Sequence, residues 1–439
     1  MQLSSQIKGY ALAKALPAKA ILPVGSVPLI VALGLVVLAF VPLVPPVDVL
    51  EGGATTRGFI EFGLILAGLG LLVICLKRQG AFSFDFESPA FLLISLFTFW
   101  AVLSSIWSPN PVLTVAKSVE LWCIALAAVV FVTLTTRAQL TNGRLETILA
   151  LSMVAVICGL VVANIFYWGV PLPTTGNPAL PLDLIGEELS LDRPRLILAY
   201  QHPLLTGDLL ALSVISLIVS DLPKVGKAIL IPLALVLLWL ADARGPTGAL
   251  VIAVIAQAVL KLRRNDLRAI ALTLVISSGL AVALFFQDSL PAALRSMVPE
   301  DVNTLNSRTE LWAKTLSEIV AQPILGCGYF ASRYLLVKDF KWAGHAHNSF
   351  LEVQLTTGVI GLLVLCAFVF YLFKEILTTR NAFLLGVTLY CLIQGTLNPL
   401  FFNPGLAMFV LTIAVLNAKH SSRLERALVP RSLSSQSDG

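Results

Sequence analysis

The sequence predicts an all-α polytopic membrane protein with about twelve transmembrane helices and two long loops on one face. Hydrophobic residues make up 57% of the 439 residues and charged residues only 13%, whereas about 25% of the residues in an average soluble protein are charged. Mean hydropathy is +0.89. The apolar residues fall in runs of about 17–25, the length that a helix needs to cross a bilayer.

The expected spans are the apolar runs, taken in order along the chain. They lie at roughly 24–45, 58–76, 90–106, 113–133, 147–168, 203–219, 226–241, 247–261, 268–286, 349–373, 381–397 and 402–418. The first run follows three lysines and shows no cleavage signal, so we expect an uncleaved anchor. Only the turn Asp242–Thr247 separates the seventh run from the eighth.

Lysine and arginine residues set the expected orientation. With the N-terminus in the cytoplasm, most of the 30 basic residues fall in cytoplasmic segments, as the positive-inside rule requires. The C-terminus is then cytoplasmic too, and the outer face carries the loops 169–202 and 287–348. The predicted organisation is a bundle of nine spans over 1–286, the loop 287–348, spans ten to twelve over 349–418, and a tail over 419–439.

The second outer loop is expected to contain one amphipathic helix, over 307–322. Ser307 and Glu310 have the spacing of a capping box, and an apolar stripe follows them. Pro323 is expected to end the helix. Such a helix would lie on the membrane or against the bundle.

The stretch His345-Ala-His347-Asn-Ser-Phe-Leu-Glu352 joins this loop to the tenth span and holds two of the four histidines. A group that titrates near neutral pH at a helix end is a candidate for chemistry. Three interpretations are open: a general base acting on a hydroxyl, a helix cap, or a metal ligand that lacks a third partner at a suitable spacing. Asn348 is expected to be the N-cap that orients His347. His202, before the sixth span, is either interfacial or part of the same site.

Four arginines on the predicted outer face are candidates for binding an anion, because arginine stays charged and grips phosphate oxygens bidentately. Arg193 and Arg195 precede the sixth span, and each could instead be an interfacial anchor. Arg244 lies in a short outer turn, where the positive-inside rule disfavours a cation. Arg308 lies in the first turn of the amphipathic helix, where its charge opposes the helix dipole; it could also be no more than an exposed charge.

The composition argues against several other kinds of site. Most cysteines lie in or beside apolar runs and none has CxxC spacing, so we expect neither a disulfide framework nor a zinc site. The net charge of +5 is modest and gives no reason to expect nucleic acid. No Asp-x-Asp cluster that could hold a metal ion falls on the predicted outer face.

Four segments together resemble the O-antigen ligase and polymerase superfamily of bacterial envelope glycan enzymes. In chain order they are Ser104–Thr114, Ala243–Gly248, Ser307–Gly328 and His345–Leu362. The resemblance covers roughly residues 100–365. Each motif is short, and it is their order and spacing that indicate the family.

The resemblance implies a fold like that of GT-C glycosyltransferases in the bacterial inner membrane. It also implies an inverting transfer, without metal or cofactor, from an undecaprenyl diphosphate carrier to an acceptor hydroxyl on the periplasmic face. The acceptor would be the lipid A core for a ligase of lipopolysaccharide maturation, or a growing glycan for a polymerase. His347 would be the essential histidine with His345 in support, and Arg195, Arg244 and Arg308 would hold the diphosphate. Membrane lipids would surround the bundle.

A secondary transporter or flippase is the alternative from a different class. Transporters place ionisable residues at mid-membrane in broken helices. Here we expect few such residues apart from Lys117 and Glu120, while the candidate groups gather on one outer face. This distribution favours an enzyme.

Overall fold

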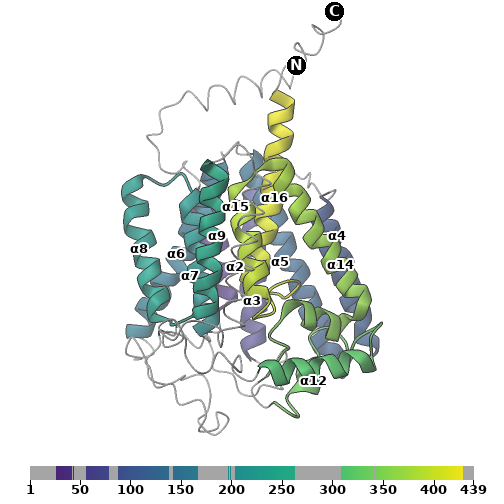
Figure 1. The fold of residues 1–439 in the computed structure, drawn as a ribbon. Helices are drawn as coiled ribbons and strands as arrows, with labels where there is room; N and C mark the ends of the chain where they lie inside the picture. The colour runs from purple at the N-terminus through teal and green to yellow at the C-terminus, as the bar shows by residue number, and fades with distance from the viewer. Residues whose placement is uncertain are drawn as a thin grey trace, which may run out of the picture.

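The computed structural model describes residues 26–41, 43, 56–78, 88–137, 142–166, 196, 198, 203–262, 308–340 and 343–428. All regular elements in these ranges are helices, as the sequence predicts (Figure 1). They are α2 (Ser26–Ala39), α3 (Thr56–Arg78), α4 (Pro89–Leu103), the 3₁₀ turn η1 (Ser104–Ile106), α5 (Pro111–Arg137), α6 (Asn142–Phe166), α7 (Pro203–Val219), α8 (Lys224–Leu240), α9 (Arg244–Leu262), α12 (Arg308–Ala321), α13 (Arg333–Leu336), α14 (Ser349–Thr379), α15 (Ala382–Gly395) and α16 (Leu406–Leu428).

Several of these helices have the length and composition of membrane spans. Five are long and apolar enough to cross a bilayer: Arg57–Arg78, Pro89–Ile106, Pro111–Thr136, Gly143–Phe166 and Ser349–Thr379. Shorter apolar helices accompany them in α2, α7, α9, α15 and α16. The protein is therefore a multi-pass membrane protein, while the count of twelve spans stays a prediction. The ninth expected span, 268–286, lies outside the described residues, as does nearly all of the loop 169–202.

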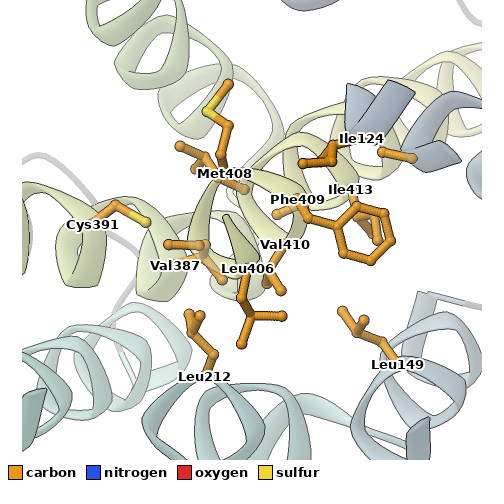
Figure 2. Packing of buried hydrophobic residues seen from close by; sticks show 14 of the residues in the cluster. Ile124, Leu149, Leu212, Val387, Cys391, Leu406, Met408, Phe409, Val410 and Ile413 are labelled. Atoms are coloured by element: carbon orange, nitrogen blue, oxygen red, sulfur yellow. The ribbon is translucent and has the colours of Figure 1, made fainter. Parts of the chain in front are cut away.

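Helix α16 lies at the centre of the bundle. Its residues 406–418 are almost all buried, and they meet side chains of α5, α6, α7 and α15 in one continuous apolar cluster (Figure 2). Examples are Phe409 and Ile413 beside Ile124, and Leu406 beside Leu212. This packing holds helices that are distant in the sequence at fixed positions relative to one another.

The expected amphipathic helix is present as α12 and lies across one end of the bundle, at a large angle to the spans (Figure 1). Leu311, Thr315 and Ile319 are buried, and the helix packs against α14. Leu316 and Val320 are 50% and 78% exposed. The predicted stripe is thus divided, with one edge against the bundle and the other facing outward. The helix ends before Pro323 as expected, whereas Ser307 of the predicted capping box is outside the described residues.

Helix α14 is broken at Gly358, which has φ 67° and ψ −166°. This conformation is essentially restricted to glycine. A Cβ atom at Gly358 would lie 2.0 Å from the carbonyl oxygen of Ile324. The break therefore marks a close approach between α14 and the segment that follows α12.

The backbone groups freed by this break find partners in two other segments. The amides of Cys327 and Gly328 donate to the carbonyls of Leu355 and Thr356, each at 2.9 Å, and the amide of Val359 donates to the carbonyl of Pro323 at 2.9 Å. Trp100 of α4 donates its indole N–H to the carbonyl of Thr357 at 2.9 Å. Inside a membrane protein an unpaired backbone group is costly, so these bonds explain how α14 tolerates the break.

Candidate functional site

The His345–Asn348 loop is fixed at the N-terminus of α14. The side-chain oxygen of Asn348 accepts from the amides of Phe350 (2.9 Å) and Leu351 (3.1 Å), which makes Asn348 the N-cap that the sequence predicted. Its side-chain nitrogen donates to the carbonyl of Thr396 at 3.3 Å. His347, directly before the cap, has φ 49°, a left-handed conformation that costs a non-glycine residue about 1–2 kcal/mol. Such strain persists only where the surroundings impose it.

Ala346, between the two histidines, is held from both sides. Its carbonyl accepts from the indole N–H of Trp312 in α12 at 3.0 Å. Its amide donates to the Glu352 carboxylate at 2.8 Å. Ala346 is fully buried, so both of these backbone groups need protein partners. The amphipathic helix and the histidine loop are therefore one structural unit.

The two histidines are coupled through the backbone. The amide of His347 donates to Nδ1 of His345 at 3.2 Å, and the ring centroids are 4.1 Å apart. Because Nδ1 of His345 accepts this bond, the neutral ring carries its proton on Nε2 and can donate there but not accept. His347 is consequently the better placed of the two to take up a proton.

A cavity of about 40 Å³ lies beside this loop. Its charged or titratable lining groups include Arg333, His345 and Glu352; the remaining lining residues are Tyr329, Phe330, Ser332, Gly344, Val353, Thr356, Pro399, Phe401, Phe402 and Asn403. His347 is not among the described lining residues. The space suffices for a few water molecules or one small polar group, but not for a sugar ring.

Arg333 lines this cavity but was not among the arginines predicted from the sequence. Its guanidinium lies 4.9 Å from the ring centroid of Phe330, and Lys117 of α5 lies 5.5 Å from the same ring. Burial lowers the pKa of Arg333, although a guanidinium stays protonated in proteins. Phe330 has φ 63°. Neither the strained phenylalanine nor the burial of Arg333 has a signal in the sequence.

Lys117 also belongs to an ion-pair network between α3 and α5. Its ammonium lies 2.7 Å from Glu120 and 3.9 Å from Glu61, and Arg57 lies 2.8 Å from Glu61. The two cations are thus matched by two carboxylates. Such matching is what allows ionisable groups to remain within a membrane bundle.

The turn that carries the early motif, Ser104–Thr114, holds the segment that leads to Arg333. The amide of Tyr329 donates to the Ser104 hydroxyl at 2.9 Å, and the Thr114 hydroxyl donates to the carbonyl of Tyr329 at 2.8 Å. Burial, followed by the nearby Glu120 and Glu352 carboxylates, raises the pKa of Tyr329 well above its ordinary value. Tyr329 therefore stays neutral and donates to the carbonyl of Phe402 at 2.8 Å.

Arg308 is the first residue of α12 and is partly buried. Burial lowers its pKa, again without removing its charge. Arg308 and Trp312 are four residues apart, so they lie on the same face of the helix. Because Trp312 bonds to Ala346, that face is the one that meets the histidine loop. Glu310 is exposed.

Arg244 begins α9, and its side chain is 51% exposed with Nε 3.6 Å from a carboxylate oxygen of Asp242. A Cβ atom at Gly245 would lie 2.7 Å from the side-chain oxygen of Gln394, at the end of α15. Two residues further on, Thr396 accepts from Asn348. The Arg244 turn and the histidine loop therefore pack against the same segment, 394–398.

A buried polar cluster, which was not predicted from the sequence, lies beneath this segment. The Asp208 carboxylate of α7 accepts from the hydroxyl of Tyr390, and Gln394 and Asn398 are also close to it. The carbonyl of Asn398 in turn accepts from the hydroxyl of Ser349 at 3.0 Å. The sequence did offer one signal for this cluster, an aspartate within the first two turns of an apolar run. Asp208 is therefore a further ionisable group inside a span, in addition to Lys117 and Glu120.

Three of the predicted site residues, Arg193, Arg195 and His202, lie outside the described residues. The others, namely Arg244, Arg308, His345, His347 and Asn348, come from segments that meet at one end of the bundle. Within the part of the chain that the structure describes, no three His, Cys, Asp or Glu side chains gather as they would around a metal ion.

Comparison with known proteins places this site within a recognised family segment. Residues 229–366 match the O-antigen ligase family. This segment runs from α8 into α14 and includes Arg244, Arg308, Arg333 and the histidine loop. The resemblance inferred from the motifs is thereby confirmed over the matched residues.

Two curated relatives agree with this match. A protein of Rickettsia conorii, which its name describes as a candidate polysaccharide ligase, is 25% identical over 123 residues. A protein of the same description from Rickettsia felis is 24% identical over 123 residues. Each alignment covers 24% of this chain and 30% of the relative, so the chain spans less than a third of the length of these relatives.

Proposed function

We propose that the protein is a membrane glycosyltransferase of the O-antigen ligase type. It would move a glycan from an undecaprenyl diphosphate carrier to an acceptor hydroxyl, with the lipid A core as the acceptor. The observation that carries the proposal is the anchoring of the histidine loop, by Trp312 on one side and by Thr396 on the other, between the Arg308 helix and the Arg244 turn. A base and two cations from distant segments thus share one end of the bundle.

In the proposed reaction His347 takes the proton of the acceptor hydroxyl. The acceptor oxygen then forms a bond to the anomeric carbon as the bond from that carbon to the diphosphate oxygen breaks. Attack opposite the leaving group inverts the anomeric centre, and the polyprenyl diphosphate leaves with the bonding electrons. A base positioned in this way contributes about 10²–10⁴-fold to the rate.

The leaving diphosphate gains negative charge, which Arg244 and Arg308 would neutralise by electrostatic stabilisation. Arg193 and Arg195 would join them from the first outer loop. Arginine can replace a metal ion in this role because it binds two phosphate oxygens at once. The reaction would proceed without a metal or other cofactor, on the periplasmic side of the inner membrane, with both termini in the cytoplasm.

The test compares His347→Ala with His420→Ala in proteoliposomes that contain a lipid-linked oligosaccharide donor and a lipid A core acceptor. His420 lies in the last part of α16, and the C-terminal end of that helix lies at the end of the bundle opposite α12 (Figure 1), so His420→Ala serves as the matched control. We expect His347→Ala to lower transfer by at least about 100-fold and His420→Ala to leave it unchanged. Transfer by His347→Ala near the wild-type rate would overturn the assignment.

The identity of the acceptor separates a ligase from a polymerase, since both would use the same donor. Mass analysis of surface glycans in a deletion strain should show loss of capped lipopolysaccharide if the protein is a ligase. Glycans reduced to single repeats would instead assign it as a polymerase. Uptake of substrate by the proteoliposomes without any glycan product would favour a transporter.

A further inference from the structure

We propose that Glu352 is a positioning residue that holds the backbone between the two histidines in its working conformation. This inference rests on the proposed function and extends it to Glu352, for which the sequence motifs predicted no role. Glu352 lies in the first turn of α14, where its amide donates to the carbonyl of Asn348 at 2.8 Å. A carboxylate is favoured near a helix N-terminus by the helix dipole.

The Glu352 carboxylate joins three segments. One oxygen accepts at 2.6 Å from the hydroxyl of Ser332, the residue directly before α13. The other oxygen accepts at 2.8 Å from the amide of Ala346. The carboxylate thereby links α14, the Arg333 segment and the histidine loop. A buried donor is costly to leave without an acceptor, so both bonds hold the carboxyl group and its partners in place.

The bond to Ala346 bears directly on the histidines. Ala346 is fully buried and is flanked by His345 and His347. If the carboxylate is removed, the Ala346 amide loses its acceptor and the peptide must rotate or shift to find another. Either movement displaces both imidazoles. A misplacement of about 1 Å can lower a rate about 100-fold, so an effect on turnover follows without any contact between Glu352 and the reacting atoms.

The experiment compares three substitutions at Glu352 in the full-length protein in proteoliposomes. Glu352→Gln keeps an oxygen for Ala346, and Ser332 can turn to accept from the new amide, so both bonds are preserved. Glu352→Ala removes both bonds. Glu352→Asp keeps a carboxyl group on a shorter side chain. Glu318→Gln is the matched control, since Glu318 pairs with Lys314 on the surface of α12, away from the loop.

We expect Glu352→Ala to lower kcat about 100-fold with KM for the acceptor changed much less. Glu352→Gln should retain most of kcat, and Glu352→Asp should fall between Glu352→Gln and Glu352→Ala because its shorter side chain reaches Ala346 less well. Glu318→Gln should match the wild type. A kcat for Glu352→Ala equal to that of Glu318→Gln would overturn the proposal.

Diethyl pyrocarbonate provides a readout that needs no substrate. It modifies neutral imidazole, and mass spectrometry of fragments of the peptide that carries His345 and His347 gives the rate at each ring. Glu352→Ala should change these rates because the loop shifts, whereas Glu352→Gln should keep the wild-type rates; unchanged rates in Glu352→Ala overturn the proposal. If Glu352→Ala does not fold, Glu352→Asp carries the test, and rates equal to those of the wild type overturn the proposal. If wild-type protein transfers no glycan, the proposed function fails, whereas the modification profile still decides the role of Glu352.

Discussion

Gly358 is the position at which one added methyl group should do the most damage to the site. In Gly358→Ala the new Cβ atom would lie 2.0 Å from the carbonyl oxygen of Ile324, 2.3 Å from its carbonyl carbon and 2.7 Å from the amide of Leu325. All three are backbone atoms, so no side-chain rotation can relieve the overlap. The φ of 67° and ψ of −166° add strain for any residue other than glycine.

The magnitude follows from two contributions. The backbone conformation costs a non-glycine residue about 1–3 kcal/mol. Separating α14 from the 323–328 segment also endangers the bonds of Cys327, Gly328 and Val359, each with a net value of about 1 kcal/mol. The expected loss in free energy of unfolding is therefore about 4–6 kcal/mol.

The assay is unfolding of the purified protein by titration with a denaturing detergent, alongside glycan transfer in proteoliposomes. Gly159→Ala is the control, because a Cβ atom there would meet nothing within 4 Å and the residue is inside α6. It should be neutral or stabilising by up to about 1 kcal/mol. A Gly358→Ala protein within about 1 kcal/mol of the control would refute the packing argument, since that is the value of a single hydrogen bond.

Three further predictions concern neighbouring residues. Asn348→Ala removes the cap and the bond to Thr396 and should lower the free energy of unfolding by about 2 kcal/mol, whereas Asn348→Asp keeps the cap but cannot donate to Thr396 and should cost about 1 kcal/mol; detergent unfolding measures both. Trp312→Phe removes the donor to Ala346, so it should lower the free energy of unfolding by about 1 kcal/mol and reduce glycan transfer severalfold. Unchanged transfer would show that α12 does not position the histidine loop. Burial raises the pKa of the Cys327 thiol, so little thiolate is present at pH 8 and a maleimide should label Cys327 only after unfolding, as mass spectrometry can show.

Local chemistry explains which site features could be predicted from the sequence. Asn348 before an apolar run is an N-cap because its side chain reaches amides only two and three residues away. The amphipathic helix could be placed to within one residue at each end because its stripe and Pro323 are local signals. Arg308 and Arg244 became candidates because a cation at a helix start, or in a short outer turn, is unusual.

Arg333 and Glu352 could not be found in this way. Arg333 is one of several charged residues in the loop 287–348, and Glu352 follows Asn348 by four residues as many first-turn carboxylates do. They share a cavity with His345, and Tyr329, which lines the same cavity, is held by Ser104 and Thr114 from more than 200 residues away.

The sequence by itself determined the helical membrane architecture, the histidine loop and the motifs within residues 229–366, the part that matches the O-antigen ligase family. Apolar length and the spacing of nearby residues are local properties of a sequence. Only the tertiary structure decided that Gly358 breaks α14 and that Cys327 and Gly328 complete its hydrogen bonds. It likewise decided that Ala346 is held between Trp312 and Glu352. These contacts join residues separated by a few to several tens of positions on different elements, and packing of the whole bundle brings them together.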